Sequence, residues 1–299
     1  MDNADRIADG HYARKQLHCP SRVVAWSHRS RFELARALVA PYAGGRLLDY
    51  GCGDGTFVAM VHASFAETRG ADVDPAQIEA CRRRLGDLRG VSFGLTSDIP
   101  AGGQPWRVIT CMEVLEHCLE GERRRILEEL ASLCTPHGRV VISVPMETGP
   151  SLLVKQSMRA VAGLRGLGDY AYRERYSVVE MIRAVAGLSV PRVVYTGAGV
   201  TGPFSYYGHK GFDWREVERD IADRFRIERR LFTPVRLTGR FANSQAWFVC
   251  ASSSRRTAES AAPYVDSRAG SSSPACAKTS RSDASAVRGA PPRRPAGVP

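Results

Sequence analysis

The chain has 299 residues, of which 43% are hydrophobic, and it carries a formal net charge of +11. This length and apolar content support one α/β domain with additions. No apolar run approaches the roughly 20 residues that a membrane-spanning helix requires, so we expect no transmembrane segment. The N-terminus is polar and slightly acidic and does not read as a secretory signal, which favours a cytoplasmic protein.

The cysteine pattern and the charge distribution argue against a zinc site and against DNA binding. The eight cysteines include no C-x-x-C pair, which argues against a zinc site and for isolated reduced thiols. From residue 251 on, eight basic and three acidic residues give a net charge of +5, so the body carries +6. A mildly basic body is compatible with an acidic substrate or a membrane surface and is weak evidence for nucleic acid. We therefore expect no DNA partner.

Hydrophobic periodicity and turn residues predict alternating strands and helices. Residues 1–20 show no clear period. We expect helices at 21–39, 56–66, 75–85, 113–134, 152–162, 178–186 and 213–225, a strand with a glycine loop at 46–55, and further strands at 68–73, 91–95, 106–112, 139–144, 226–235 and 244–250. The strand–helix alternation predicts a doubly wound, mainly parallel sheet.

The organising stretch is 46–55, RLLDYGCGDG. Strand, glycine loop and helix together are typical of a nucleotide-binding crevice at the carboxyl edge of a parallel sheet, although a glycine-rich structural turn is the alternative. A dinucleotide loop reads G-x-G-x-x-G, whereas here the third glycine comes one residue early and Thr56 stands in the last glycine's place. Asp49, two residues before the first glycine, would repel a pyrophosphate and attract a cationic ligand.

Asp49, Gly51, Gly53 and Gly55 resemble the first motif of class I S-adenosylmethionine-dependent methyltransferases, D/E-x-G-x-G-x-G. The resemblance covers about 46–250, with its specific motifs between 46 and 145. It implies an α/β fold with a doubly wound, Rossmann-like, seven-stranded sheet, mostly parallel with the last strand antiparallel. S-adenosylmethionine carries a sulfonium and an ammonium and no phosphate, which agrees with an acid before the loop.

The resemblance also implies where S-adenosylmethionine binds. G-A-D-V-D-P matches the family's G-x-D-x-x-P, and the match implies that Asp72 binds the ribose hydroxyls. Asp74 is a competing choice for this role and could instead cap the following helix. Asp98 matches the acid that takes the adenine amine, with a turn aspartate as the alternative. The implied cofactor residues are Asp49, Gly51, Cys52, Gly53, Gly55, Asp72, Val73, Ser97, Asp98 and Glu113.

A second constellation, Glu113, Glu116 and His117, reads E-x-x-E-H after the fourth strand. If that turn is helical, all three share one face, and their chemistry suits a divalent ion such as Mg²⁺. The pattern resembles ubiquinone-biosynthesis O-methyltransferases and small-RNA 3′-end 2′-O-methyltransferases, where a metal is held; in the RNA enzymes a further histidine, here His209, completes the site. Because E-V-L-E-H is also widespread in class I methyltransferases without a metal, we assign none. We interpret His209 and His117 as candidate catalytic bases, with a surface histidine as the alternative for His209.

The other segments are assigned by composition and position. We expect an N-terminal helical lid at 1–45, a methyltransferase domain at 46–250 with a substrate cap inserted at about 146–207, and a disordered basic tail at 251–299. In the lid, Trp26, His28, Arg29 and Arg31 either touch an anionic or sugar-like substrate or form a solvated basic face. The insertion could also be a plain structural elaboration.

These features lead to one functional expectation and two alternatives. The resemblance implies an S-adenosylmethionine-dependent methyltransferase that acts on a small-molecule acceptor, at a hydroxyl oxygen. An RNA-modifying 2′-O-methyltransferase is disfavoured because the charge of the body is modest and no separate RNA-binding domain is visible. The other alternative is a non-catalytic Rossmann-type nucleotide-binding protein.

Overall fold

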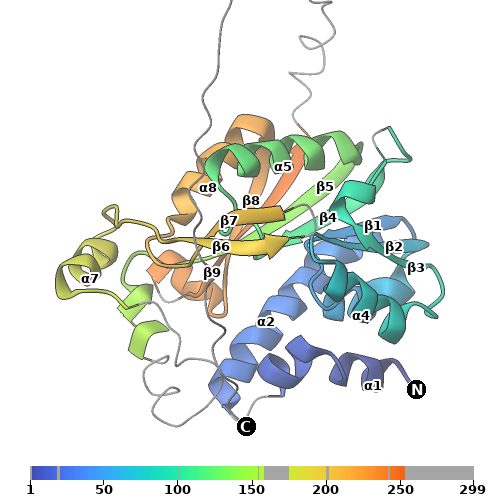
Figure 1. Ribbon diagram of the computed structural model, residues 1–299, viewed down its shortest axis with the longest axis horizontal. Helices are drawn as coiled ribbons and strands as arrows, with labels where there is room; N and C mark the ends of the chain where they lie inside the picture. Colours follow the sequence, from blue (N-terminus) through green and yellow to red (C-terminus); the bar gives the residue numbers. More distant parts are fainter. Residues whose placement is uncertain are drawn as a thin grey trace, which may run out of the picture. The chain divides into compact units, whose positions relative to one another are not determined.

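The fold is built on a seven-stranded sheet with the strand order β3-β2-β1-β4-β5-β9-β8 (Figure 1). The computed structural model describes residues 2–18, 21–100, 102–153, 155–157, 175–199, 202–241 and 243–252. Strands β3, β2, β1, β4 and β5 run parallel, and β9 is antiparallel to both of its neighbours, β5 and β8. The predicted doubly wound sheet with an antiparallel last strand is therefore confirmed.

The elements have the following bounds. The strands are β1 Arg46–Tyr50, β2 Glu67–Asp72, β3 Val91–Leu95, β4 Trp106–Met112, β5 Cys134–Pro145, β6 Val194–Gly199, β7 Gly202–Tyr207, β8 Phe225–Thr233 and β9 Gln245–Ser252. The longer helices are α1 Asn3–Ala8, α2 Arg22–Val39, α3 Thr56–Val61, α4 Pro75–Leu85, α5 Glu120–Leu133, α7 Val178–Val185 and α8 Trp214–Arg224. The short helices are η1 Ala13–Leu17, η2 Ala40–Tyr42, η3 His62–Ser64, η4 Thr96–Asp98 and η6 Arg236–Phe241.

Helices cover both faces of the sheet (Figure 1). Successive residues of a strand point to opposite faces, so the central strands are apolar on both sides. Leu48 of β1 packs in a cluster with residues of α5 and α8, whereas Leu47 packs in a second cluster with residues of α2 and α3. Burial on both faces fixes the register of the central strands, and with it the position of the loops that follow them.

Two elements begin five residues or more away from the predicted position, whereas the other predicted starts within the described residues agree within one residue. Helix α5 begins at Glu120 rather than 113, because the backbone is left-handed at Glu113 and the residues up to 119 form a turn. Strand β5 begins at Cys134 rather than 139, across an irregular register beside β4. Neither feature changes the hydrophobic period, so the pattern alone did not reveal them.

The N-terminal segment forms α1 and η1, where the sequence showed no period. Asn3 Nδ2 donates to the carbonyl of Ala59 in α3 (2.9 Å), and Arg6 Nη1 donates to the carbonyl of Arg84 in α4 (2.8 Å). Ile7 packs between the clusters of these two helices. The segment is thereby anchored on the helix that follows the glycine loop.

The insertion between β5 and α8 contains α7 and an antiparallel hairpin, β6–β7. The predicted helix at 178–186 is confirmed as α7, and most of the one predicted at 152–162 lies outside the described residues. The hairpin was not predicted, because glycines interrupt its alternating pattern. Tyr207 N at its end donates to the carbonyl of His117 (2.9 Å), which ties the hairpin to the turn after β4. Its role as a substrate cap stays a prediction.

Beyond Ser252 the chain lies outside the described residues, so the prediction for the basic tail stays a prediction. Within the described ranges, no helix combines the length and the apolarity that crossing a membrane would take.

Helices α5 and α8 are joined by a buried ion pair. Arg123 Nε donates to Asp220 Oδ2 (2.6 Å), and both side chains are almost fully buried. Two charges removed from water depend on each other, because loss of one leaves the other uncompensated.

We expect Asp220→Ala to lower the free energy of unfolding by about 3–5 kcal/mol, because it leaves the Arg123 guanidinium buried and unpaired. Glu79→Gln in the exposed Arg83–Glu79 pair is the control and should cost about 0.5 kcal/mol or less. Urea unfolding measures both, and equal losses would show that the buried pair contributes nothing special.

Candidate functional site

The residues predicted to bind the cofactor converge on the carboxyl edge of the parallel strands, because such strands all end on that edge. Asp49 and the glycine loop lie at the end of β1, Asp72 ends β2, Ser97 and Asp98 follow β3, and Glu113 follows β4. The sheet thus brings together acids and backbone groups from four separate parts of the sequence.

The glycine loop adopts a backbone that its glycines require. Gly51, Gly53 and Gly55 have φ angles of 77°, 52° and 72°, in the left-handed region that glycine tolerates best. At Gly51 a Cβ would lie 2.2 Å from Val114 Cγ2, so a side chain there would collide with the turn after β4. The loop therefore presents bare backbone beside β4.

The two competing acids after β2 have different surroundings. Asp74 Oδ1 accepts a hydrogen bond from Ala76 N (2.8 Å) and so caps α4. Asp72 Oδ2 accepts from Gly53 N (2.8 Å) in the glycine loop, and its Oδ1 accepts from Asp74 N (3.0 Å). Asp72 is thus the acid that faces the loop, whereas the neighbouring Val73 is 70% exposed.

Asp49 is buried, and its Oδ1 accepts a hydrogen bond from Thr110 Oγ1 (2.6 Å). The pKa of this carboxyl is raised to about 7, chiefly by burial and in part by the nearby Asp72 and Asp54, although the hydrogen bond from Thr110 opposes the shift. Three acids around one glycine loop form a site that favours a positively charged ligand.

The other predicted cofactor residues lie around the same loop. Cys52 is buried beneath it and its thiol lies 3.7 Å from the carbonyl of Gly53. Ser97 and Asp98 are exposed on η4, where Asp98 Oδ2 accepts from Leu95 N (3.2 Å). That bond is the one expected of a turn aspartate, so both interpretations of Asp98 stand.

Arg31 is a site residue whose position the sequence did not reveal. Its guanidinium is buried, 3.6 Å from Glu113 Oε2, and it donates to the hydroxyl of Tyr12. Tyr12 N in turn donates to Asp54 Oδ2 (2.8 Å) in the glycine loop. Tyr12 thereby connects Arg31 of α2 with the glycine loop at the carboxyl edge.

A sequence signal for Arg31 did exist. The arginine precedes the buried Ala35 and Leu38 by four and seven positions, which places it on the apolar face of α2. Its neighbour Trp26 is half exposed, so the predicted basic cluster divides between the two faces of the helix.

The turn after β4 corrects the expected arrangement of the E-x-x-E-H motif. It is not helical, and Glu113 has a φ of 57°, a left-handed backbone that is rare outside glycine and concentrates at functional sites. Glu113 pairs with Arg31, whereas Glu116 and His117 gather with His209, and their potential ligand atoms all lie within 4.8 Å of one another. His209 was expected to complete a group of all three motif residues, whereas in the structure it gathers with two of them and Glu113 lies apart beside Arg31.

Glu116 is completely buried, and neither of its carboxylate oxygens has a hydrogen-bond partner in the described part of the chain. Burial raises the pKa of this carboxyl well above its usual range, and the charge of Glu113 adds to the shift. Buried polar groups are normally paired, so these two oxygens indicate a missing partner that donates protons or carries positive charge.

The protonation pattern of His117 follows from its contacts. Its Nδ1 lies 2.9 Å from the carbonyl oxygen of Tyr207, and a carbonyl only accepts, so Nδ1 carries the hydrogen. In the neutral ring Nε2 then has a free lone pair, and it lies 3.8 Å from Glu116 Oε1. The ring of His209 meets that of His117 edge to face, with centroids 4.8 Å apart. Two imidazoles and a carboxylate are a donor set that a divalent metal ion accepts.

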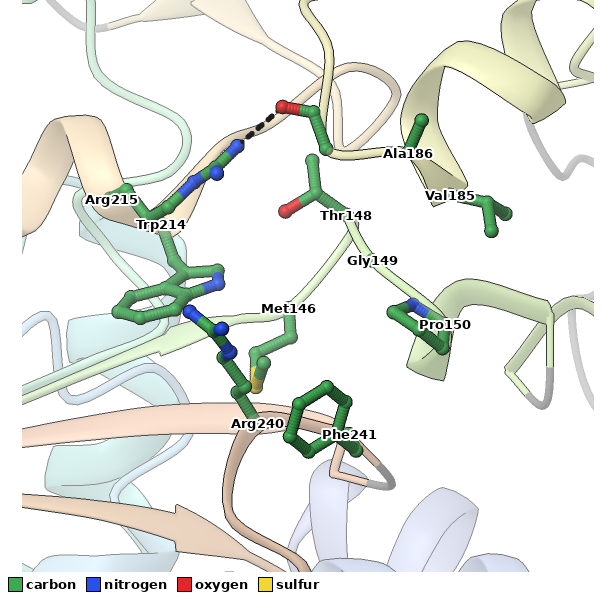
Figure 2. Close-up of a pocket in the computed structure, with 11 residues that line it drawn as sticks. Met146, Thr148, Gly149, Pro150, Val185, Ala186, Trp214, Arg215, Arg240 and Phe241 are labelled. Atoms are coloured by element: carbon green, nitrogen blue, oxygen red, sulfur yellow. Dashed lines mark hydrogen bonds between the residues drawn. The ribbon is translucent and has the colours of Figure 1, made fainter.

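A hollow of about 200 Å³ lies beyond the end of β5 (Figure 2). Met146, Trp214 and Phe241 form apolar walls, and Arg215 is held by the carbonyl of Gly187 (2.7 Å), the dashed line in Figure 2. Its walls come from four separate segments, so it depends on the insertion being folded. Its lining suits a small, partly apolar molecule.

Comparison with known proteins finds a matching family and several relatives of this chain. A family described as "Methyltransferase domain" matches residues 26–176. The demethylmenaquinone methyltransferase of Clavibacter sepedonicus is 35% identical over 130 residues, 42% of this chain and 52% of that protein. The ubiquinone biosynthesis O-methyltransferase of Ralstonia nicotianae is 29% identical over 166 residues, 50% of this chain and 65% of that protein. The chain thus spans about half to two thirds of the length of these relatives.

A solved structure supports the fold. The PH0226 protein from Pyrococcus horikoshii OT3 superposes with a TM-score of 0.53 at 15% identity, over 85% of this chain and 100% of that chain. At this identity the likeness concerns the fold alone, and it agrees with the Rossmann-like sheet described above.

Replacing Asp72 tests the ribose assignment. We expect Asp72→Ala to weaken the binding of S-adenosylmethionine by about 1–3 kcal/mol, the range for losing hydrogen bonds to a charged group. Asp72→Asn keeps an acceptor for Gly53 N and separates loop distortion from the lost charge. Asp74→Ala is the matched control: it should cost about 1 kcal/mol of stability and leave the affinity unchanged. Calorimetry measures the affinities, and an unaltered value for both Asp72 variants would remove the acid from the site.

The raised pKa of Asp49 predicts pH-dependent cofactor binding. A carboxyl with a pKa of about 7 is partly protonated at neutral pH, and a cationic ligand favours its ionised form, so binding should release a proton and weaken as the pH falls below about 7. The ligand's own amine also titrates nearby, so the comparison is with Asp49→Asn. Calorimetry in buffers of different ionisation enthalpy counts the protons. Equal release by both proteins would contradict the prediction.

Proposed function

The chain belongs to the methyltransferase family whose domain matches its residues 26–176, and from this premise we propose that the protein transfers the methyl group of S-adenosylmethionine to a hydroxyl oxygen of a small, quinol-like acceptor. Family membership confirms the predicted resemblance to class I S-adenosylmethionine-dependent methyltransferases and, with it, the predicted cofactor. The acceptor class is the part that we propose. It is supported by two relatives, a demethylmenaquinone methyltransferase and a ubiquinone biosynthesis O-methyltransferase.

One observation carries the proposal: Glu116, His117 and His209 gather at the same edge of the sheet as the glycine loop. The donor methyl and the acceptor oxygen must meet at one place, and the edge where the cofactor loop lies also carries two imidazoles and a buried carboxylate. Groups of this kind move a hydroxyl proton or hold a cation beside it.

The cofactor end of the site follows from charge. Asp72 offers a carboxylate oxygen to the ribose hydroxyls, and Asp49 supplies negative charge close to the ammonium and sulfonium groups of the ligand. Arg31 is a buried cation beside Glu113 at this edge, and we assign it to the carboxylate of the methionine moiety. Opposite charges would thus be matched at both ends of a zwitterionic ligand.

The donor set at the acceptor end fits a divalent metal ion, although the sequence alone led us to assign none. Glu116, His117 and His209 would hold it, and the two unpaired oxygens of the buried carboxylate are the observation that supports the fit. When bound, such an ion lowers the pKa of a hydroxyl beside it. Glu116 supplies negative charge for the ion, and the carbonyl of Tyr207 keeps the Nε2 lone pair of His117 available.

Methyl transfer sets a simple requirement for the protein. The bond between oxygen and the methyl carbon forms as the bond between carbon and sulfur breaks, so the acceptor hydroxyl must give up its proton. Orientation and exclusion of water supply most of the remaining rate enhancement. The same Nε2 of His117 that would bind a cation is the atom that can accept this proton when no cation is present.

A transfer assay tests the proposal. With labelled S-adenosylmethionine and a panel of catechols and hydroquinones, wild-type protein should label at least one acceptor. Glu116→Gln and His209→Ala should lower the rate by about 100-fold or more while the cofactor affinity stays within about twofold. His137→Ala, at an exposed position near the amino end of β5, should match wild type.

Two results of this assay would contradict the proposed function. Added RNA provides the alternative acceptor, and label that enters only the RNA would overturn the small-acceptor proposal. Unchanged rates in Glu116→Gln and His209→Ala would remove the cluster from the reaction.

A further inference from the structure

Arg192, which lies two residues before β6, connects the two segments that carry the histidines of the cluster. Its Nη2 donates to the carbonyl of Glu116 (2.5 Å) and to the carbonyl of Gly208 (3.0 Å). These two carbonyls belong to the residues immediately before His117 and His209. One planar nitrogen thus bridges two backbone positions that are far apart in the sequence.

Two aromatic rings fix the plane of this guanidinium. Its central carbon lies 3.9 Å from the centroid of the Tyr207 ring and 5.1 Å from that of Phe212. Arginine stacks on aromatic faces and donates in its own plane, so the rings hold the hydrogen bonds in one direction. Phe212 is buried and belongs to the turn after His209, where its N donates to the His209 carbonyl (3.1 Å).

The neighbouring backbone contacts form the rest of the same frame. Tyr207 N donates to the His117 carbonyl (2.9 Å), His117 Nδ1 donates back to the Tyr207 carbonyl (2.9 Å), and Gly208 N donates to the Val193 carbonyl (3.0 Å). These bonds hold His117 against the end of β7 and hold Gly208 against the start of the hairpin. The bridge from Arg192 is the contact that spans from the Glu116 carbonyl to the Gly208 carbonyl.

We propose that Arg192 is a positioning residue that sets the separation of the His117 and His209 rings, whose centroids lie 4.8 Å apart. Its described hydrogen bonds go to the two carbonyls that it bridges, and it acts through them. Its significance for catalysis rests on the proposed function, whereas the ring separation is a property of the protein itself.

A role of Arg192 through its charge and a role through its two hydrogen bonds predict different behaviour of the lysine variant. A positive charge near Glu116 would survive in Arg192→Lys, but an ammonium on a flexible stem cannot stack on Tyr207 and reach both carbonyls in one plane. If Arg192 acted only through its charge, lysine would restore the behaviour of wild type. If it acts through the bridge, lysine and glutamine variants share the defect.

The test compares wild type with Arg192→Lys, Arg192→Gln and the control Arg183→Gln. Arg183 is an exposed arginine of α7 whose Nε donates to one carbonyl, that of Ser189 (3.0 Å). In metal-free protein we measure the nuclear Overhauser effect between the His117 and His209 rings. In addition, we titrate Mn²⁺ and S-adenosylmethionine by calorimetry.

We expect both Arg192 variants to lose the ring-to-ring effect and to bind Mn²⁺ about tenfold or more weakly, the scale seen when a residue that supports a metal ligand is removed. Their affinity for S-adenosylmethionine should stay within about twofold of wild type, because the described hydrogen bonds of Arg192 go to the carbonyls of Glu116 and Gly208. Arg183→Gln should behave as wild type in all three measurements.

Other outcomes overturn the proposal. Retention of the ring-to-ring effect in both variants would show that other contacts set the separation, and full recovery by lysine would show that charge suffices. A parallel loss of S-adenosylmethionine affinity in both variants would indicate general unfolding in place of positioning. If wild type binds no Mn²⁺, the metal assignment under the proposed function fails, and the ring-to-ring effect still decides the role of Arg192.

Discussion

The structure depends on carboxylates that the fold holds away from water at one edge of its sheet. Asp49 and Glu116 are buried, and burial raises the pKa of both. A buried anion is costly unless a positive charge or several hydrogen-bond donors compensate it. Asp49 has a hydroxyl as its partner, and neither carboxylate oxygen of Glu116 has a hydrogen-bond partner in the described part of the chain. A bound proton, as the raised pKa values indicate, or a cationic ligand stabilises such carboxyls, and we connect both ends of the proposed reaction with them.

The fold creates this edge from separate parts of the sequence. The parallel strands bring the acids to one side, the glycines let a ligand approach the backbone, and α2 places Arg31 beside Glu113. The insertion after β5 adds the second half, because its hairpin ends beside His117 and its last turn supplies His209. A function that needs a charged donor and a hydroxyl acceptor side by side is therefore distributed over the whole domain rather than over one motif.

The sequence predicted what is locally encoded. The strands at 91–95 and 106–112 have the expected bounds, because an apolar run and its flanking turn residues define a strand within a few positions. Asp74 was identified as a possible cap because a proline follows it, and it does cap α4. The glycine loop was recognised for the same reason, since spacing and residue type alone specify its backbone.

What the sequence missed depends on contacts between distant segments. The predicted helix over the E-x-x-E-H motif was wrong, because no hydrophobic period reveals a single left-handed residue at Glu113. His209 was suggested by resemblance, but its contact with His117 requires an insertion of about sixty residues to fold back. For Arg31 the sequence left a substrate contact and a solvated face open, and it did not single out Arg192, since their acidic or carbonyl partners become neighbours only in the folded chain.

The most direct test of the central claim compares ligands of different charge on the unmodified protein. Calorimetric titration with S-adenosylmethionine, S-adenosylhomocysteine and NAD⁺ asks whether the acidic edge selects a ligand with an ammonium group and no phosphate. We predict saturable one-to-one binding of the first two and none of the pyrophosphate-containing dinucleotide. Binding of NAD⁺ in their place, or no affinity for either sulfur compound, would contradict the account.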